Sequence, residues 1–201
     1  MADKKMTTIN LIKKLQSFGR GFFTIADLEK IIGLPRNSLK VALNRLTKQG
    51  VLERLTRGVY QLSINPAEAG VVANQLYYPS YLSFEAALAR HGILSQIPYT
   101  QTFATIKKSK KIWLKETEIE YTQIKKELFF GYVLADGIYL ARPEKALLDQ
   151  LYLVSRGKRS LNMEELDLSI INKNRLFKYA KKFPAAVQLS SRSRNVRCST
   201  K

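Results

Sequence analysis

The stretch from Phe23 to Leu62 constrains the fold more than any other part of the chain, because it has the order helix, tight turn, helix and two-stranded hairpin. Thr24 is a good N-cap for the first helix, and Gly33 ends that helix. Pro35 makes the turn, since a proline pushes the residue before it out of helical geometry. The sequence then predicts a second helix over about residues 36–49, which the next glycine stops.

The second predicted helix has two different faces. Leu39, Leu43 and Leu46 recur at i, i+4 and i+7, so they form an apolar stripe suited to a protein core. Another face carries four polar residues at a spacing of four: Arg36, Lys40, Asn44 and Lys48. We therefore expect a basic, amide-bearing stripe to face outward.

Residues 51–62 read as a hairpin that follows this helix directly. Two runs suited to strands, 51–55 and 59–62, flank the turn Thr56-Arg57-Gly58, where glycine can take a positive φ. Phe22-Phe23 is predicted as a short strand that pairs with the hairpin, and a helix capped by Thr7 or Thr8 completes a three-helix core. The whole order is typical of a winged helix-turn-helix domain.

In such a domain the second helix is placed to enter a DNA major groove, where Arg can pair with guanine and Asn with adenine. The tip of the hairpin is placed to touch phosphate or the minor groove. The predicted DNA-binding residues are Arg36, Asn37, Ser38, Lys40, Asn44, Lys48, Arg54 and Arg57. Two alternatives stay open: a basic helix face that is only solvated, and a winged helix used for protein contact.

The charge of the chain is strongly positive and unevenly distributed. The formal net charge is +18, of which residues 1–66 carry +8, residues 67–167 carry +1 and residues 168–201 carry +9. Excess positive charge at both ends indicates a polyanionic partner. Together with the winged-helix pattern, it favours double-stranded DNA over RNA or a membrane surface.

The sequence carries no sign of export. No window approaches the roughly 18 uninterrupted apolar residues of a transmembrane helix, and the N-terminal residues do not resemble a signal peptide. The single cysteine, Cys198, cannot form an internal disulfide, which favours a reducing compartment. We therefore expect a cytoplasmic protein with no membrane partner.

Residues 63–66, Ser-Ile-Asn-Pro, interrupt both helical and strand periodicity and predict a domain boundary. The predicted organisation is a winged helix-turn-helix domain over residues 1–65, a second domain over residues 66–184 and a basic tail over residues 185–201 that we expect to be disordered. The second domain mixes short alternating runs with helices, two of them predicted over 163–168 and 173–182. The fold class is therefore α+β, with a small, mainly antiparallel sheet in the second domain.

Catalytic chemistry has little support in the residue types. His91 is the only histidine and precedes a helix-ending glycine, where a capping role is favoured over catalysis. Glu116, Glu118 and Glu120 alternate on a predicted strand, and pairing with the basic run at residues 107–111 is favoured over acid/base chemistry. We predict no catalytic residue, no metal ligand and no cofactor.

Two stretches in the second half of the chain resemble the AbiEi family of antitoxins from type IV toxin-antitoxin systems. They are residues 81–88, Tyr-Leu-Ser-Phe-Glu-Ala-Ala-Leu, followed by His91-Gly92, and residues 137–149, Gly-Ile-Tyr-Leu-Ala-Arg-Pro-Glu-Lys-Ala-Leu-Leu-Asp. The residue types at 142–145 favour a strand-to-helix junction, with a proline and a glutamate at the start of the helix. The alternative is that these residues make a direct functional contact.

The resemblance implies a DNA-binding N-terminal domain that represses its own promoter and a C-terminal domain that counteracts a nucleotidyltransferase-like toxin. Direct contact with that toxin stays open. The expectation is thus a non-enzymatic autorepressor and antitoxin. The alternative is an enzyme acting on nucleic acid, or an accessory to one, that its winged helix delivers to DNA.

Overall fold

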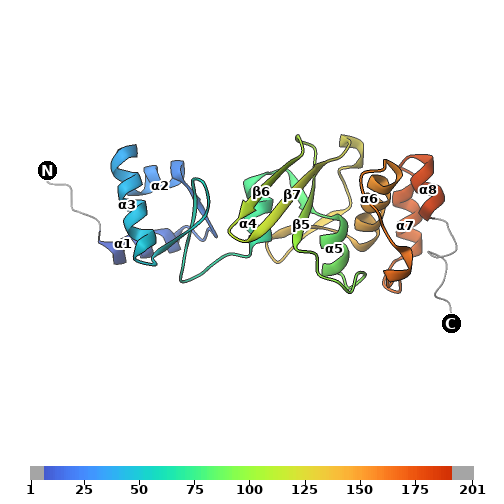
Figure 1. Cartoon of the computed structure of the whole chain (residues 1–201), viewed down its shortest axis with the longest axis horizontal. Helices are drawn as coiled ribbons and strands as arrows, with labels where there is room; N and C mark the ends of the chain where they lie inside the picture. Colours follow the sequence, from blue (N-terminus) through green and yellow to red (C-terminus); the bar gives the residue numbers. More distant parts are fainter. Residues whose placement is uncertain (1–6, 192–201) are drawn as a thin grey trace. The chain divides into compact units, whose positions relative to one another are not determined.

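A computed structural model of the protein describes residues 7–191, which divide into two compact units (Figure 1). Unit 1 runs to Val72 and also includes Trp113–Glu116, and unit 2 holds the other described residues. Helix α4, Ala69–Leu76, begins in unit 1 and ends in unit 2. The domain boundary between residues 65 and 66 stays a prediction.

Unit 1 has the order of elements that the sequence predicts for a winged helix. Its helices are α1 (Thr8–Ser17), α2 (Ile25–Ile32) and α3 (Arg36–Lys48), and its strands are β1 (Phe23–Thr24), β2 (Leu52–Thr56) and β3 (Val59–Leu62). The three strands form an antiparallel sheet in the order β1-β3-β2, with Phe23 opposite Tyr60. The short strand before α2 therefore pairs with the hairpin as expected.

Local sequence signals explain where α2 begins and ends. The Thr24 hydroxyl accepts a hydrogen bond from the Asp27 N–H at 3.2 Å, and the Asp27 carboxylate accepts one from the Thr24 N–H at 2.8 Å, which completes a capping box. Gly33 ends the helix at a φ of 75°, in the left-handed region that glycine tolerates. The core of unit 1 consists of Leu11, Leu15, Phe23, Leu28, Leu39, Leu43, Leu46, Leu52 and Leu62.

Unit 2 is built on a six-stranded sheet in the order β6-β7-β5-β4-β9-β8. The strands are β4 (Ser80–Leu82), β5 (Thr100–Thr105), β6 (Lys110–Leu114), β7 (Thr117–Gln123), β8 (Tyr132–Ala135) and β9 (Ile138–Ala141). The pairs β4-β5 and β8-β9 are antiparallel, whereas β4-β9 and β5-β7 are parallel. The α+β fold class is confirmed, and the sheet contains two parallel pairs beside its antiparallel ones. Alternation along a strand does not tell which strand lies beside it, so the sequence did not predict the parallel pairs.

The helices of unit 2 include α5 (Phe84–Arg90), α6 (Pro143–Ser155), α7 (Lys173–Ala180) and α8 (Ala185–Ser191). Helix α6 packs against α5, α7 and α8, and Figure 1 shows α6, α7 and α8 side by side. Ten consecutive residues of α6, from Glu144 to Leu153, are buried, so this helix has no exposed stripe in its first three turns. The apolar residues Ala146, Leu147 and Leu151 are buried, while Val154 is half-buried.

Two predictions about the C-terminal part need correction. The helix predicted over residues 163–168 is only a 3-10 turn, Met163–Glu165. Residues 185–191, predicted as part of a disordered tail, form α8, whose Val187 and Ser191 side chains are buried. A helix of seven residues is too short to show periodicity in sequence, and its packing on α6 and α7 stabilises it. The remainder of the predicted tail, residues 192–201, lies outside the described residues.

Candidate nucleic-acid interface

Helix α3 presents the residue types of a DNA-reading helix on its solvent side. Its core stripe, Leu39, Leu43 and Leu46, is almost completely buried, with at most 3% of each side chain exposed. All eight residues predicted to bind DNA are exposed: Arg36, Asn37, Ser38, Lys40, Asn44 and Lys48 on α3, and Arg54 and Arg57 on the hairpin. Whether they contact DNA stays a prediction.

Successive residues of an α-helix point about 100° apart around its axis, since there are 3.6 residues per turn. On this helical wheel, the exposed residues of α3 form three rows. The row opposite the leucine stripe, here called the central row, is Asn37, Val41, Asn44 and Lys48. One flank carries Arg36 and Lys40, and the other carries Ser38 and Arg45. The prediction from sequence missed Val41 and Arg45, although the spacing i, i+4, i+7 counted from Asn37 would have found Val41.

The hairpin turn places a cation at its tip. Arg57 lies between β2 and β3 beside Gly58, whose φ of 81° permits the tight turn. The register of the two strands shifts between Arg54 and Thr56, and the Arg54 guanidinium donates a hydrogen bond to the Thr56 carbonyl at 3.3 Å. Arg54 is thus held against the backbone of its own strand, while Arg57 extends into solvent.

The cations of this surface have no carboxylate partner among the described residues. Within residues 7–191, no carboxylate forms an ion pair with Arg36, Lys40, Arg45, Lys48 or Arg57. Some cations of unit 2 do form ion pairs with Asp or Glu, namely Lys111, Lys145, Arg159 and Arg175, whereas others, such as Lys125 and Lys126, form none among the described residues. Unpaired cations on one helix and one hairpin tip are available to phosphate groups.

Residues 10–63 match the family described as transcriptional regulator, AbiEi antitoxin. This AbiEi-like segment contains most of α1, all of α2 and α3 and the complete hairpin of unit 1, and with them every residue of the candidate interface. The family resemblance is thereby confirmed for the winged helix. The stretches 81–88 and 137–149, which suggested it, lie outside the matched residues. No curated protein matches the chain.

Those two stretches meet in a buried polar cluster of unit 2. The Asp149 carboxylate on α6 accepts hydrogen bonds from the hydroxyls of Tyr81, at 2.9 Å, and Ser83, at 2.8 Å, and pairs with the Lys145 ammonium one helical turn away. Lys145 also donates to the Tyr81 hydroxyl oxygen at 2.8 Å. We call Tyr81, Ser83, Lys145 and Asp149 the buried cluster.

The buried cluster holds its charges away from water. Lys145 and Asp149 are completely buried, and the Tyr81, Phe130 and Phe183 rings lie within 5.3 Å of the ammonium. Burial lowers the pKa of Lys145 and raises the pKa of Asp149, because both charged forms lose hydration. Ser83 occupies the N-cap position of α5, but its hydroxyl donates to Asp149, and α5 has no side-chain cap hydrogen bond.

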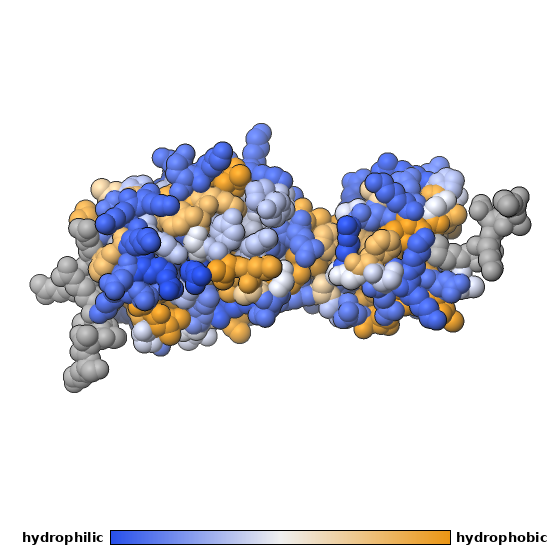
Figure 2. Space-filling view, turned by 180° about the vertical axis from the view of Figure 1, so that it is seen from behind, coloured by the Kyte–Doolittle hydropathy of each residue, from blue (hydrophilic) through white to orange (hydrophobic). Residues whose placement is uncertain are grey.

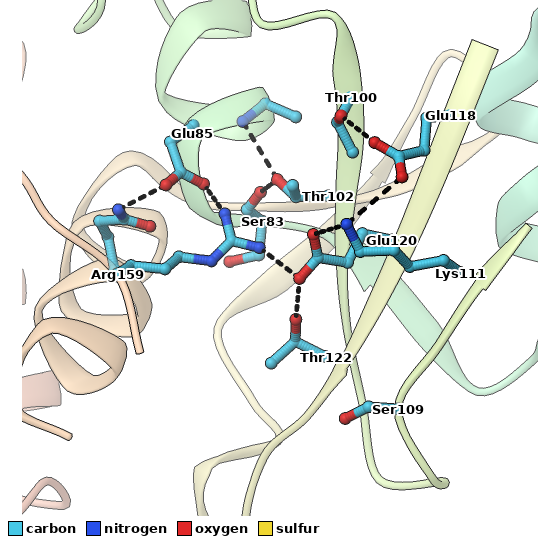
Figure 3. A network of polar contacts seen from close by, with 12 residues as sticks. Ser83, Glu85, Thr100, Thr102, Ser109, Lys111, Glu118, Glu120, Thr122 and Arg159 are labelled. Atoms are coloured by element: carbon cyan, nitrogen blue, oxygen red, sulfur yellow. Dashed lines mark hydrogen bonds and ion pairs between the residues drawn. The ribbon is translucent and has the colours of Figure 1, made fainter. Parts of the chain in front are cut away.

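A second set of polar contacts lies on the side of the sheet shown in Figure 3. Arg159 joins Glu85 on α5 to Glu120 on β7, which it contacts at 2.8 Å. Lys111 on β6 pairs with Glu118 at 3.3 Å and Glu120 at 3.5 Å. The predicted ion pairing of the alternating glutamates with the basic run is confirmed for these two residues through Lys111 alone.

The remaining parts of that prediction are not realised in the described residues. Glu116 precedes β7 and is exposed, so it does not share the face of Glu118. Lys107 and Lys110 lie over the Tyr77 ring, at 5.1 and 3.9 Å from its centre.

His91 is the C-cap residue of α5, and its Nε2 lies 2.7 Å from the Ala141 carbonyl oxygen, which links α5 to the end of β9.

Two kinds of feature are absent from residues 7–191. No group of three or more His, Cys, Asp or Glu side chains is arranged to hold a metal ion. None of the helices in this range is long and apolar enough to cross a membrane. On the face drawn in Figure 2, hydrophilic residues cover much of each unit, with hydrophobic residues interspersed among them.

Proposed function

We propose that the protein is a DNA-binding autorepressor and the antitoxin of a type IV toxin-antitoxin system. It acts in the cytoplasm on the double-stranded DNA of its own promoter and counteracts a nucleotidyltransferase-like toxin. One observation carries the proposal: a segment similar to AbiEi transcriptional regulators presents unpaired cations and amides on the exposed side of its second core helix.

The geometry of unit 1 supports the proposed DNA-binding step. Helix α3 enters the major groove with its leucine stripe turned to the core, so that the amides and cations of its other side reach the DNA. The hairpin tip, through Arg57, touches the phosphate backbone beside the groove. Each phosphate contact displaces a condensed counterion, so binding weakens steeply as salt rises.

The experiment is a titration of the promoter DNA of the protein's own operon with the full chain, followed by fluorescence anisotropy at several salt concentrations. The triple variant Arg36→Ala/Lys40→Ala/Asn44→Ala should lose at least tenfold in affinity, since it removes two cations and one amide from α3. The matched control, Lys125→Ala/Lys126→Ala/Asn174→Ala, also removes two cations and one amide, but from exposed positions in unit 2, and should bind like the parent. If the α3 variant binds like the parent, this helix does not read the operator.

The antitoxin part of the proposal is tested separately by co-expressing the chain with the adjacent toxin gene and measuring growth. We place this function in unit 2, which buries its own extensive core, including ten consecutive residues of α6. The Arg36→Ala/Lys40→Ala variant should therefore lose repression of a promoter reporter and still rescue growth. Growth arrest with the parent chain present would refute the antitoxin role.

The proposed action is binding and not catalysis. The buried cluster contains a hydroxyl, an ammonium and a carboxylate in contact, which are groups that can serve a nucleophilic reaction. Its Ser83, Lys145 and Asp149 side chains are completely buried, so no substrate reaches them in this conformation. The cluster instead ties β4 to α6.

A further inference from the structure

Val41 on α3 is exposed without a structural reason. Of its side chain 71% is accessible, whereas the leucines of the same helix are buried. A β-branched residue also has a lower helix propensity than the straight-chain residues that usually occupy solvent-facing helix positions. Neither packing nor helix propensity therefore favours valine here.

The surroundings of Val41 are polar and cationic. The central row places Asn37 one turn before it and Asn44 one turn after it, and both amides are exposed. No other large exposed hydrophobic residue lies on α3. The core of a protein-protein contact gathers several large apolar side chains and is depleted of lysine, which is not the composition found around Val41.

This composition matches the edges of A·T base pairs in the major groove. Adenine offers N7 and N6 to an Asn amide, and thymine offers a 5-methyl group that is read by apolar contact. From Asn37 to Asn44 the helix rises about 10 Å, close to the length of three base-pair steps. The flanking cations, Arg36 and Lys40 on one side and Arg45 on the other, border the central row and face the two phosphate backbones when α3 lies in the groove.

We infer that the central row of α3 reads A·T base pairs, with Val41 against a thymine 5-methyl group and the Asn37 and Asn44 amides at adenine. The inference rests on the proposed DNA binding and adds the class of base pair that α3 recognises. Lys48, at the end of the row, and the flanking cations contact phosphates and add affinity without sequence preference.

The test begins with selection of preferred sites from random double-stranded DNA by the full chain. Each thymine of the selected site is then replaced by uracil, which removes only the 5-methyl group and leaves the protein unchanged. Uracil at one of these positions should weaken binding of the parent about fourfold, because one methyl group is then no longer buried against the protein. The Val41→Ala variant should bind the thymine site about fourfold more weakly and should no longer distinguish thymine from uracil there.

A matched control is Ile9→Ala on α1, which removes another exposed aliphatic side chain, 66% accessible, away from α3. It should retain the thymine preference of the parent. Asn37→Ala and Asn44→Ala should each cost about tenfold on the selected site, and less on a site whose adenine has been replaced.

The possible outcomes separate this inference from the proposed function. If no sequence is selected and binding is equal on all DNA, the autorepressor proposal itself fails. If a site is selected but α3 faces G·C pairs, or uracil replacement has no effect at any position, the DNA-binding function stands and the reading of A·T pairs by Val41 is overturned. A Val41→Ala protein that still prefers thymine at the sensitive position overturns it as well.

Discussion

The buried cluster of unit 2 allows a sharp test of what an internal ion pair contributes. In the Asp149→Ala variant, the Lys145 ammonium stays completely buried and loses its only carboxylate partner within hydrogen-bonding distance among the described residues. The hydroxyls of Tyr81 and Ser83 lose their acceptor at the same time. Removing one partner of a buried ion pair costs about 3–5 kcal/mol, because the remaining charge is left uncompensated.

This cost is large relative to the total stability of a domain, which is about 5–15 kcal/mol. The double variant Lys145→Met/Asp149→Leu removes both charges while keeping apolar bulk, and replacement of a whole buried pair is often neutral or stabilising. It still leaves two hydroxyls without an acceptor, at about 1–3 kcal/mol for each buried group that stays unsatisfied. We therefore expect the double variant to be more stable than Asp149→Ala but not more stable than the parent.

The assay is urea unfolding followed by far-ultraviolet circular dichroism, with the midpoint and slope of each curve compared. The control is Lys111→Ala, which breaks two ion pairs of a lysine whose side chain is 60% exposed and should change the unfolding curve little. The reasoning is refuted if Asp149→Ala unfolds at the same urea concentration as the control. It is refuted equally if the double variant is less stable than Asp149→Ala.

Two other predictions concern unit 1. Replacing Arg57 by Ala should weaken binding to all DNA sequences alike, because one phosphate contact is lost. The slope of log affinity against log salt concentration should fall by about one unit. A changed sequence preference in the same titrations would show that the hairpin reads bases. Burial raises the pKa of Asp27, but the hydrogen bonds from Thr24 outweigh it and leave that pKa below its ordinary value. The Asp27 carboxylate therefore stabilises the fold at pH values above its unfolded-state pKa, and this contribution is lost as the pH falls through the folded-state pKa. Asp27→Asn should lower the free energy of unfolding by about 1 kcal/mol at neutral pH and should flatten the acid dependence of thermal unfolding. An unchanged pH profile would contradict the capping role.

The elements of unit 1 could be predicted from sequence because their signals are local. The Thr24 cap, the Gly33 stop and the leucine stripe of α3 each involve residues within two helical turns of one another. The same holds for Pro143, which begins α6, and for the turn that carries Arg57. These features depend on backbone geometry and on spacing along the chain, and both are readable from one sequence.

The tertiary structure decided the features that join distant residues. The parallel pairing of β4 with β9 brings Leu82 beside Leu140, and helix packing makes α8 stable although its seven residues carry no periodic signal. The same packing changes the meaning of single side chains, since Ser83 resembles a helix cap in sequence and serves as a donor to Asp149 in the fold. The partners in the buried cluster lie as many as 68 positions apart, so their burial, and with it the energy of their charges, follows only from the three-dimensional arrangement.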